Sequence, residues 1–157
     1  MRDEDLIAAL AKTIPDFEHL KDLCRTPTED EDLVKLAQVF YGDLDGDGKD
    51  EVAASAMTCA AGTYGPDVYG VFRIGDSGEL ILLNKDEAPE VFRGRNTREG
   101  IRKAPGIGIE KLRYVESFAV YQEDDANADP SAGRREFRYR WDGSKLVLDD
   151  VVDFPPE

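Results

Sequence analysis

The stretch GDLDGDGKDEV, residues 42–52, constrains this chain more than any other part of its sequence. Aspartates stand at alternate positions 43, 45 and 47, with Gly46 and Gly48 between and after them, and two more acids follow before a small, apolar run begins. Glycine permits the positive φ values that let a tight loop curl, so the alternating carboxylates can point toward one centre. Two unit charges 4 Å apart repel by about 4 kcal/mol at an effective dielectric constant of 20. The pattern therefore indicates a loop that binds a divalent cation.

The spacing of the acids suits calcium, which takes six to eight hard oxygen ligands from carboxylates, carbonyls and water. Numbered from Asp43, the loop has carboxylates at positions 1, 3, 5, 8 and 9, and the carbonyl of Lys49 stands at position 7. An EF-hand would need a bidentate Glu at position 12. That position is Ala54, and a strand-like run follows it, so the loop is not an EF-hand.

The run Asp43 to Glu51 resembles the D-x-D-x-D-G-x-x-[DE] loops of integrin-type FG-GAP and related VCBS repeats, where the loop joins two β-strands. It is also similar to small exported bacterial envelope proteins that carry a single such loop. The resemblance implies calcium ligation by the acids at positions 1, 3, 5 and 9 and by the carbonyl at position 7. Carried onto this chain, the implied metal ligands are Asp43, Asp45, Asp47, Lys49 through its carbonyl, and Glu51.

The N-terminal residues predict two short helices, over 3–12 and 15–24, because their apolar side chains recur at helical spacing. Residues 33–42 fit a helix or a strand, and the β-branched and aromatic end Val39-Phe40-Tyr41 favours a strand. Residues 85–111 are irregular, and APGIGI within them has the composition of a loop.

The remaining apolar runs have the alternation of strands. The predicted strands cover EVAASAMTCAAG, VYGVFRIG, LILLN and KLRYVESFAVYQ, followed by a hairpin in RREFRYRWDGSKLVLDDVV with an Asp142-Gly143 turn. We therefore predict a single α+β domain, residues 1–157, with short N-terminal helices packed on a mostly antiparallel β-sheet. Its helical part spans residues 1–32 and its β-rich part residues 33–157.

The charge of the chain bears on its partners. Its formal net charge of −14 argues against general affinity for nucleic acid or anionic membranes, which need cationic surfaces. No apolar stretch reaches the 18 residues of a membrane span, and the acidic start MRDED is not a signal peptide. The calcium loop nevertheless favours an exported protein, periplasmic or at the cell surface, whose signal this chain lacks. A cytoplasmic protein is the alternative.

The two cysteines, Cys24 and Cys59, allow two interpretations. As a disulfide they would close a loop worth roughly 4 kcal/mol in the chain-entropy model, which fits an oxidising compartment. As separate buried thiols they would fit a cytosolic protein.

Three other features of the sequence could have a function. His19 is the sole histidine, and no Ser occupies a G-x-S-x-G elbow, so we expect His19 to be an ordinary side chain. The basic run from Val91 to Arg113 could dock an acidic partner or an anionic glycan, although neutralising acidic loops of its own fold is the preferred interpretation. The aromatic stripe Phe137, Tyr139 and Trp141 is expected to be core.

These observations favour a non-catalytic, exported calcium-binding domain in which calcium is structural and which binds another macromolecule, a protein or a glycan. No catalytic residue is predicted, the expected cofactor is Ca²⁺, and we expect a monomer. Two alternatives stay open: an inhibitor or immunity protein whose acidic surface blocks a basic target, and a hydrolase with a structural calcium.

Overall fold

The structure of the chain is a computed structural model. The structure describes residues 1–14, 17–23, 33–59, 68–83, 106–122, 124–126 and 129–157. Helices α1 (Asp3–Ala11) and α2 (Phe17–Leu23) come first. The strands are β1 (Val34–Gly42), β2 (Glu51–Thr58), β3 (Val68–Ile74), β4 (Leu80–Leu82), β5 (Gly106–Glu110), β6 (Arg113–Ala119), β7 (Arg134–Trp141) and β8 (Leu146–Phe154).

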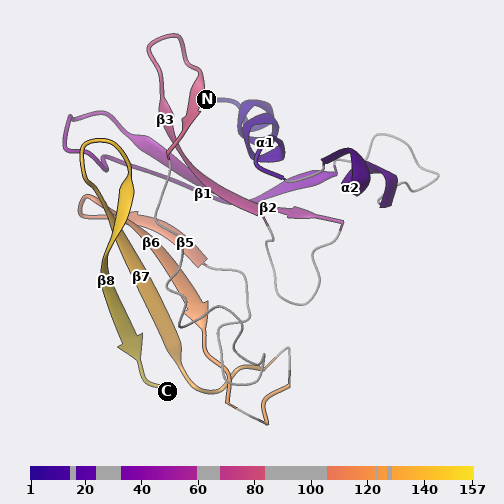
Figure 1. The fold of residues 1–157 in the computed structure, drawn as a ribbon, viewed down its shortest axis with the longest axis vertical. Helices are drawn as coiled ribbons and strands as arrows, with labels where there is room; N and C mark the ends of the chain where they lie inside the picture. Colours follow the sequence, from indigo (N-terminus) through magenta and orange to yellow (C-terminus); the bar gives the residue numbers. More distant parts are fainter. Residues whose placement is uncertain (15–16, 24–32, 60–67, 84–105, 123, 127–128) are drawn as a thin grey trace.

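The strands form two four-stranded sheets, in the orders β1-β2-β3-β4 and β5-β6-β7-β8 (Figure 1). Every neighbouring pair is antiparallel, so each sheet is a simple meander. The α+β prediction is therefore wrong, because the described fold is mainly β with two sheets. The sequence prediction gave too much weight to two short helical segments, and alternation along a strand does not reveal which sheet the strand joins.

The main core lies between the two sheets. Ala53 and Val71 of the first sheet meet Ile107, Tyr114, Phe137, Tyr139 and Leu146 of the second sheet in one buried cluster. The prediction that Phe137 and Tyr139 belong to the core is confirmed, and Trp141 packs partly buried against the same cluster.

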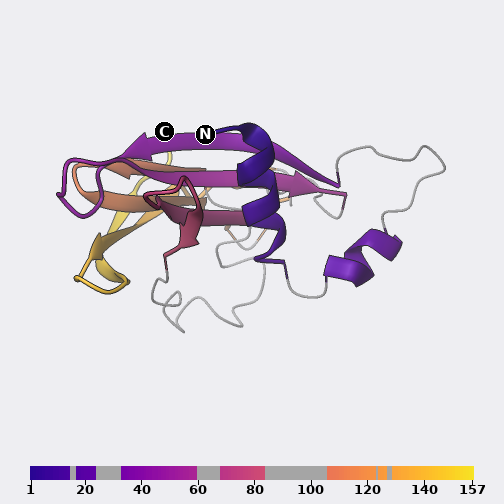
Figure 2. The same ribbon diagram turned by 90° about the horizontal axis from the view of Figure 1, so that it is seen from above.

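A second cluster covers the opposite face of the first sheet. There α1, which crosses the strands in Figure 2, contributes Leu6 and Leu10 against Val34, Val52 and Phe72. β2 is thus buried on both faces, which explains its small apolar sequence: Val52 faces α1, whereas Ala53 faces the second sheet. Neither helix in the described part of the chain has the length and apolarity that a membrane crossing requires.

Several predicted elements are present. The helix over 3–12 corresponds to α1, and the segment 33–42 contains a strand, β1, over Val34–Gly42. The β7–β8 hairpin turns at Asp142-Gly143, where the Asp142 amide donates to the Lys145 carbonyl at 3.0 Å and Gly143 has a φ of 103°. The prediction of a loop over APGIGI is wrong from Gly106 onward, because Gly106–Glu110 forms strand β5. Glycine lowers strand propensity, but Ile107 supplies a buried core contact that outweighs this cost.

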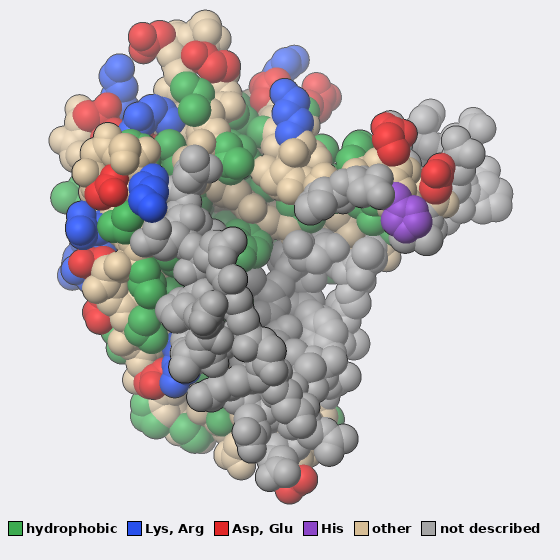
Figure 3. Space-filling model, viewed as in Figure 1, with side chains coloured by type: hydrophobic (Ala, Val, Ile, Leu, Met, Phe, Trp, Pro, Cys, Tyr) green, Lys and Arg blue, Asp and Glu red, His purple; other side chains and the backbone are tan. Residues whose placement is uncertain are grey.

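Acids and bases are interleaved on the outer surface of the second sheet. Figure 3 shows red and blue side chains side by side along the flank where Figure 1 draws β7 and β8. Arg113 pairs with Asp149 at 2.9 Å, and Arg135 donates to Asp153 at 2.9 Å. Such exposed pairs contribute at most about 1 kcal/mol each, and they give this surface paired charges of both signs.

Candidate metal centre

The acidic loop, residues 43–50, is the turn of the β1–β2 hairpin, whose last register pair is Gly42 with Glu51. Leu44 points from the loop into the core between the sheets and is 2% exposed. This apolar residue between two aspartates anchors the loop to the end of the inter-sheet core.

The loop carboxylates organise the backbone of the loop itself. Asp43 accepts hydrogen bonds from the Gly46 amide at 2.7 Å and the Gly48 amide at 2.9 Å. Asp45 likewise accepts a hydrogen bond from the Asp47 amide at 3.0 Å. Gly46 and Gly48 have φ values of 79° and 86°, so the expected positive-φ curl is present at both glycines.

Three of the five predicted ligand residues come together. Asp43, Asp45 and Glu51 each place a carboxylate oxygen within 4.8 Å of the others. Oxygens on opposite sides of one calcium ion lie about 5 Å apart, since each Ca–O distance is 2.3–2.6 Å. Hard carboxylate oxygens at this spacing fit a divalent cation such as Ca²⁺, Mg²⁺ or Mn²⁺. The donor set therefore fits the group that the sequence predicts.

Asp47 and Lys49 lie outside this group of three. Both are exposed, and Asp47 Oδ1 accepts a 2.8 Å hydrogen bond from the Lys49 amide. The Lys49 ammonium lies 3.8 Å from Asp76 on the β3–β4 turn, at a largely exposed position. Ligation by the Asp47 carboxylate and by the Lys49 carbonyl stays a prediction.

Glu51 is the buried member of the cluster, with 1% of its surface exposed. Its Oε2 accepts a 2.7 Å hydrogen bond from the buried Leu44 amide. Burial raises the pKa of the Glu51 carboxyl above its ordinary value. The Leu44 hydrogen bond and the Arg73 charge lower the pKa, whereas the negative charges of Asp45 and Asp47 raise it further. A nearby divalent cation would favour the ionised form of this carboxyl.

Arg73 of β3 completes the cluster, and sequence reasoning missed it. Its Nη2 lies 2.7 Å from Asp45 Oδ2, and its Nε lies 3.6 Å from Glu51 Oε1. The register that pairs Val52 with Phe72 places Glu51 opposite Arg73 on the inter-sheet face. The available signal was a single charged residue in the otherwise apolar and aromatic strand VYGVFRI.

The Arg73 guanidinium also touches the second sheet. Its central carbon lies 4.7 Å from the ring centroid of Trp141 in β7, within cation–π distance. A cavity of about 260 Å³ adjoins the loop on the side of the β3–β4 turn, and Glu51, Arg73 and Asp76 are among its lining residues. The candidate metal centre thus lies where the acidic loop, β3 and the second sheet meet.

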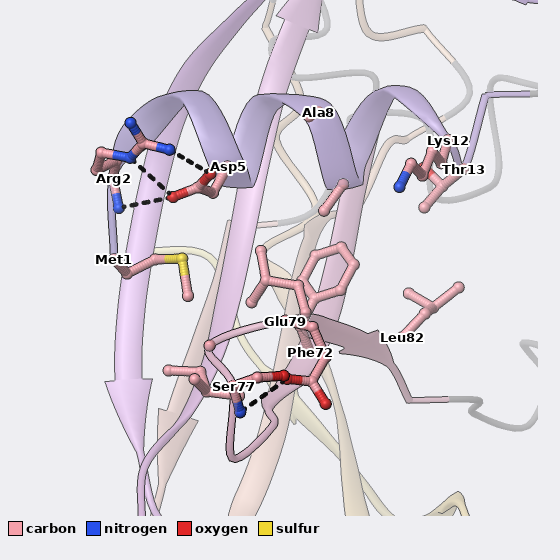
Figure 4. Close-up of a pocket in the computed structure, with 14 residues that line it drawn as sticks. Met1, Arg2, Asp5, Ala8, Lys12, Thr13, Phe72, Ser77, Glu79 and Leu82 are labelled. Carbon is pink, nitrogen blue, oxygen red and sulfur yellow. Dashed lines mark hydrogen bonds and ion pairs between the residues drawn. The ribbon is translucent and has the colours of Figure 1, made fainter.

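A groove of about 810 Å³ lies between α1 and the β3–β4 hairpin (Figure 4). Phe72 and Leu82 provide apolar surface, and charged side chains on both sides are held locally. Arg2 pairs with Asp5 at 3.2 Å, and Glu79 accepts a hydrogen bond from the Ser77 amide at 3.1 Å. We assign no ligand to this groove.

Other candidates from the sequence are only partly described. Cys24 lies outside the described residues, so the Cys24–Cys59 bridge stays a prediction, and the described chain contains no free cysteine. His19 lies on the seven-residue helix α2 and is exposed. Most of the basic run, residues 91–105, also lies outside the described residues. Arg113 at its end pairs with Asp149 at 2.9 Å, which agrees with neutralisation within the fold.

Comparisons of the chain with protein-family models, curated proteins and solved structures found no match. The likeness to FG-GAP and VCBS loops therefore rests on the loop residues alone.

Proposed function

We propose that this chain is a non-catalytic domain stabilised by calcium, with residues 43–51 as its calcium-binding loop. The observation that carries the proposal is the convergence of Asp43, Asp45 and Glu51 within 4.8 Å. The role of the ion is structural: it would cross-link the start and the end of the β1–β2 turn and neutralise carboxylates that the fold holds together.

The geometry supports a structural task over a catalytic one. Asp43 uses both carboxylate oxygens to hold the Gly46 and Gly48 amides, and Glu51 holds the Leu44 amide. Carboxylates committed to backbone donors are poorly suited to proton transfer, because moving a proton onto them would weaken those hydrogen bonds. Calcium bound by the same carboxylates would instead reinforce the loop.

An exported location is part of the proposal. Calcium sites of extracellular modules commonly bind at about 10⁻⁴ to 10⁻³ M, which requires the calcium concentrations found outside the cytosol. Binding of another macromolecule, a protein or a glycan, completes the proposal.

Thermal melts in EDTA, calcium and magnesium test the calcium site. We expect calcium to raise the melting temperature of the wild type, because a ligand stabilises the state that binds it. Asp45→Asn should abolish most of the rise. Asp50→Asn is the matched control, since Asp50 lies in the same loop but is exposed and outside the cluster. No calcium response in the wild type at millimolar concentrations would reject the proposal.

A further inference from the structure

The Arg73 guanidinium pairs with two of the three carboxylates that would bind the proposed calcium ion. It bonds Asp45 Oδ2 at 2.7 Å and forms an ion pair with Glu51 at 3.6 Å. The side chains of these two acids are 13% and 1% exposed, so water screens them only partly. A positive charge is thus already present inside the acidic cluster.

Arg73 does not use all of its hydrogen-bond donors in its interaction with the acidic cluster. Its Nε is buried and has no hydrogen-bond partner, although the Glu51 carboxylate lies 3.6 Å away. A buried donor without a partner is unfavourable, and a guanidinium has five N–H groups to satisfy. The adjoining cavity of about 260 Å³ provides space into which the Arg73 side chain can move. Arg73 is therefore well placed to leave the carboxylates.

We propose that Arg73 is the internal counter-cation of the acidic cluster and that a bound divalent ion displaces its guanidinium. The inference rests on the calcium site proposed above and adds a regulator to it. The guanidinium balances only one of the three carboxylate charges, whereas a divalent ion balances two, so the ion is the stronger counter-charge for the cluster. The ion and the guanidinium repel each other at this range, so each weakens the binding of the other, as linkage requires.

The displacement is transmitted to the second sheet through Trp141. The guanidinium lies 4.7 Å from the centroid of this ring, so its departure changes the electrostatic surroundings of the indole. Trp141 is the only tryptophan in the chain. Its fluorescence therefore reports directly on the position of Arg73, separately from the heat of calcium binding.

The test is calcium titration by calorimetry and by Trp141 fluorescence, on the wild type, Arg73→Gln and Arg113→Gln. Arg113 is the matched control: its side chain is 39% exposed against 34% for Arg73, and it pairs with an acid at 2.9 Å on the outer face. Typical coupling free energies correspond to affinity changes of about 5- to 150-fold. Arg73→Gln should bind calcium more tightly within this range, and its fluorescence response should be lost. Arg113→Gln should behave as the wild type.

The outcomes separate this inference from the proposed function. If no variant binds calcium, the proposed site and the inference both fall. If the wild type binds calcium but Arg73→Gln binds equally or more weakly, or keeps the full fluorescence change, only the inference is overturned. Should Arg73→Gln fail to fold without calcium, Arg73→Lys takes its place, because lysine keeps the charge but lacks the planar fork. It should show a smaller gain in affinity, and no gain would overturn the inference.

Discussion

Replacing Glu51 with glutamine should leave the calcium-free protein almost as stable as the wild type while removing most of its stabilisation by calcium. Glu51 is 1% exposed, and its carboxylate accepts the 2.7 Å hydrogen bond from the Leu44 amide. Glutamine has the same size and retains an acceptor oxygen, so the buried amide stays satisfied. The substitution removes the charge, which burial already disfavours, as the raised pKa of Glu51 indicates.

In calcium-free buffer two effects of Glu51→Gln oppose each other. Removing the charge relieves desolvation and repulsion from Asp45, but it also removes the ion pair with Arg73. Because Arg73 is 34% exposed, the pair is partly screened and should contribute about 1 kcal/mol or less. We expect the free energy of unfolding to change by less than about 1 kcal/mol. Glu51→Ala should cost about 1–3 kcal/mol for the orphaned amide alone.

In calcium the two proteins should separate. Wild type at a free calcium concentration of 100 times its Kd gains about 2.7 kcal/mol. Mutating a residue that only hydrogen-bonds to a metal ligand typically lowers metal affinity by about 10- to 100-fold. Loss of a charged ligand should therefore lower calcium affinity by about 100-fold. At the same calcium concentration Glu51→Gln would then gain only about 0.4 kcal/mol. Urea unfolding in EDTA and in calcium measures both quantities. Two results would refute the reasoning: calcium stabilisation of Glu51→Gln equal to that of the wild type, or a decrease in its free energy of unfolding in EDTA as large as that of Glu51→Ala.

Three further predictions concern the surroundings of the loop and the other hairpins. Leu44→Ala should lower the free energy of unfolding by about 2–5 kcal/mol, because Leu44 is 2% exposed in the core; a loss below 1 kcal/mol in urea would contradict this anchor. Lys111 and Leu112 have φ values of 46° and 66°, so Lys111→Asn combined with Leu112→Gly should stabilise the β5–β6 turn by about 1–2 kcal/mol, and a lower melting temperature would argue against this strain. The amides of Lys145 and Ser144 donate to Asp142 and lower its pKa. Wild type should therefore exceed Asp142→Asn in stability above the unfolded-state pKa, and the difference should vanish as pH falls through the lower folded-state pKa; a pH-independent difference would exclude this linkage.

The loop and its flanking strands could be predicted from sequence because their signals are local. Alternating acids and glycines determine the turn at 43–50, and alternation predicts the strands that enter and leave it. The Asp142-Gly143 turn is a similar local signal, since the turn residues are contiguous. In each case the residues that determine the structure are neighbours in the chain.

The division into two sheets could not be predicted in this way. Whether β4 or β5 continues the first sheet depends on packing between residues far apart in sequence, such as Ala53 with Phe137. The role of Arg73 was hidden for the same reason: its partner Asp45 is 28 residues away, and the pair depends on the β2–β3 register. Of the ligands that the resemblance implies, only Asp43, Asp45 and Glu51 come together in the structure. Asp47 and Lys49 are exposed and lie outside this group.

Calcium titration calorimetry on chelator-treated wild type, Asp45→Asn and Asp50→Asn tests the central claim most directly. The account predicts one calcium ion per chain for the wild type and for Asp50→Asn, with binding in Asp45→Asn weakened by about 100-fold or lost. No binding by the wild type up to several times the roughly 10⁻³ M upper range of extracellular sites would contradict the account. Equal binding by Asp45→Asn would place the ion elsewhere in the chain.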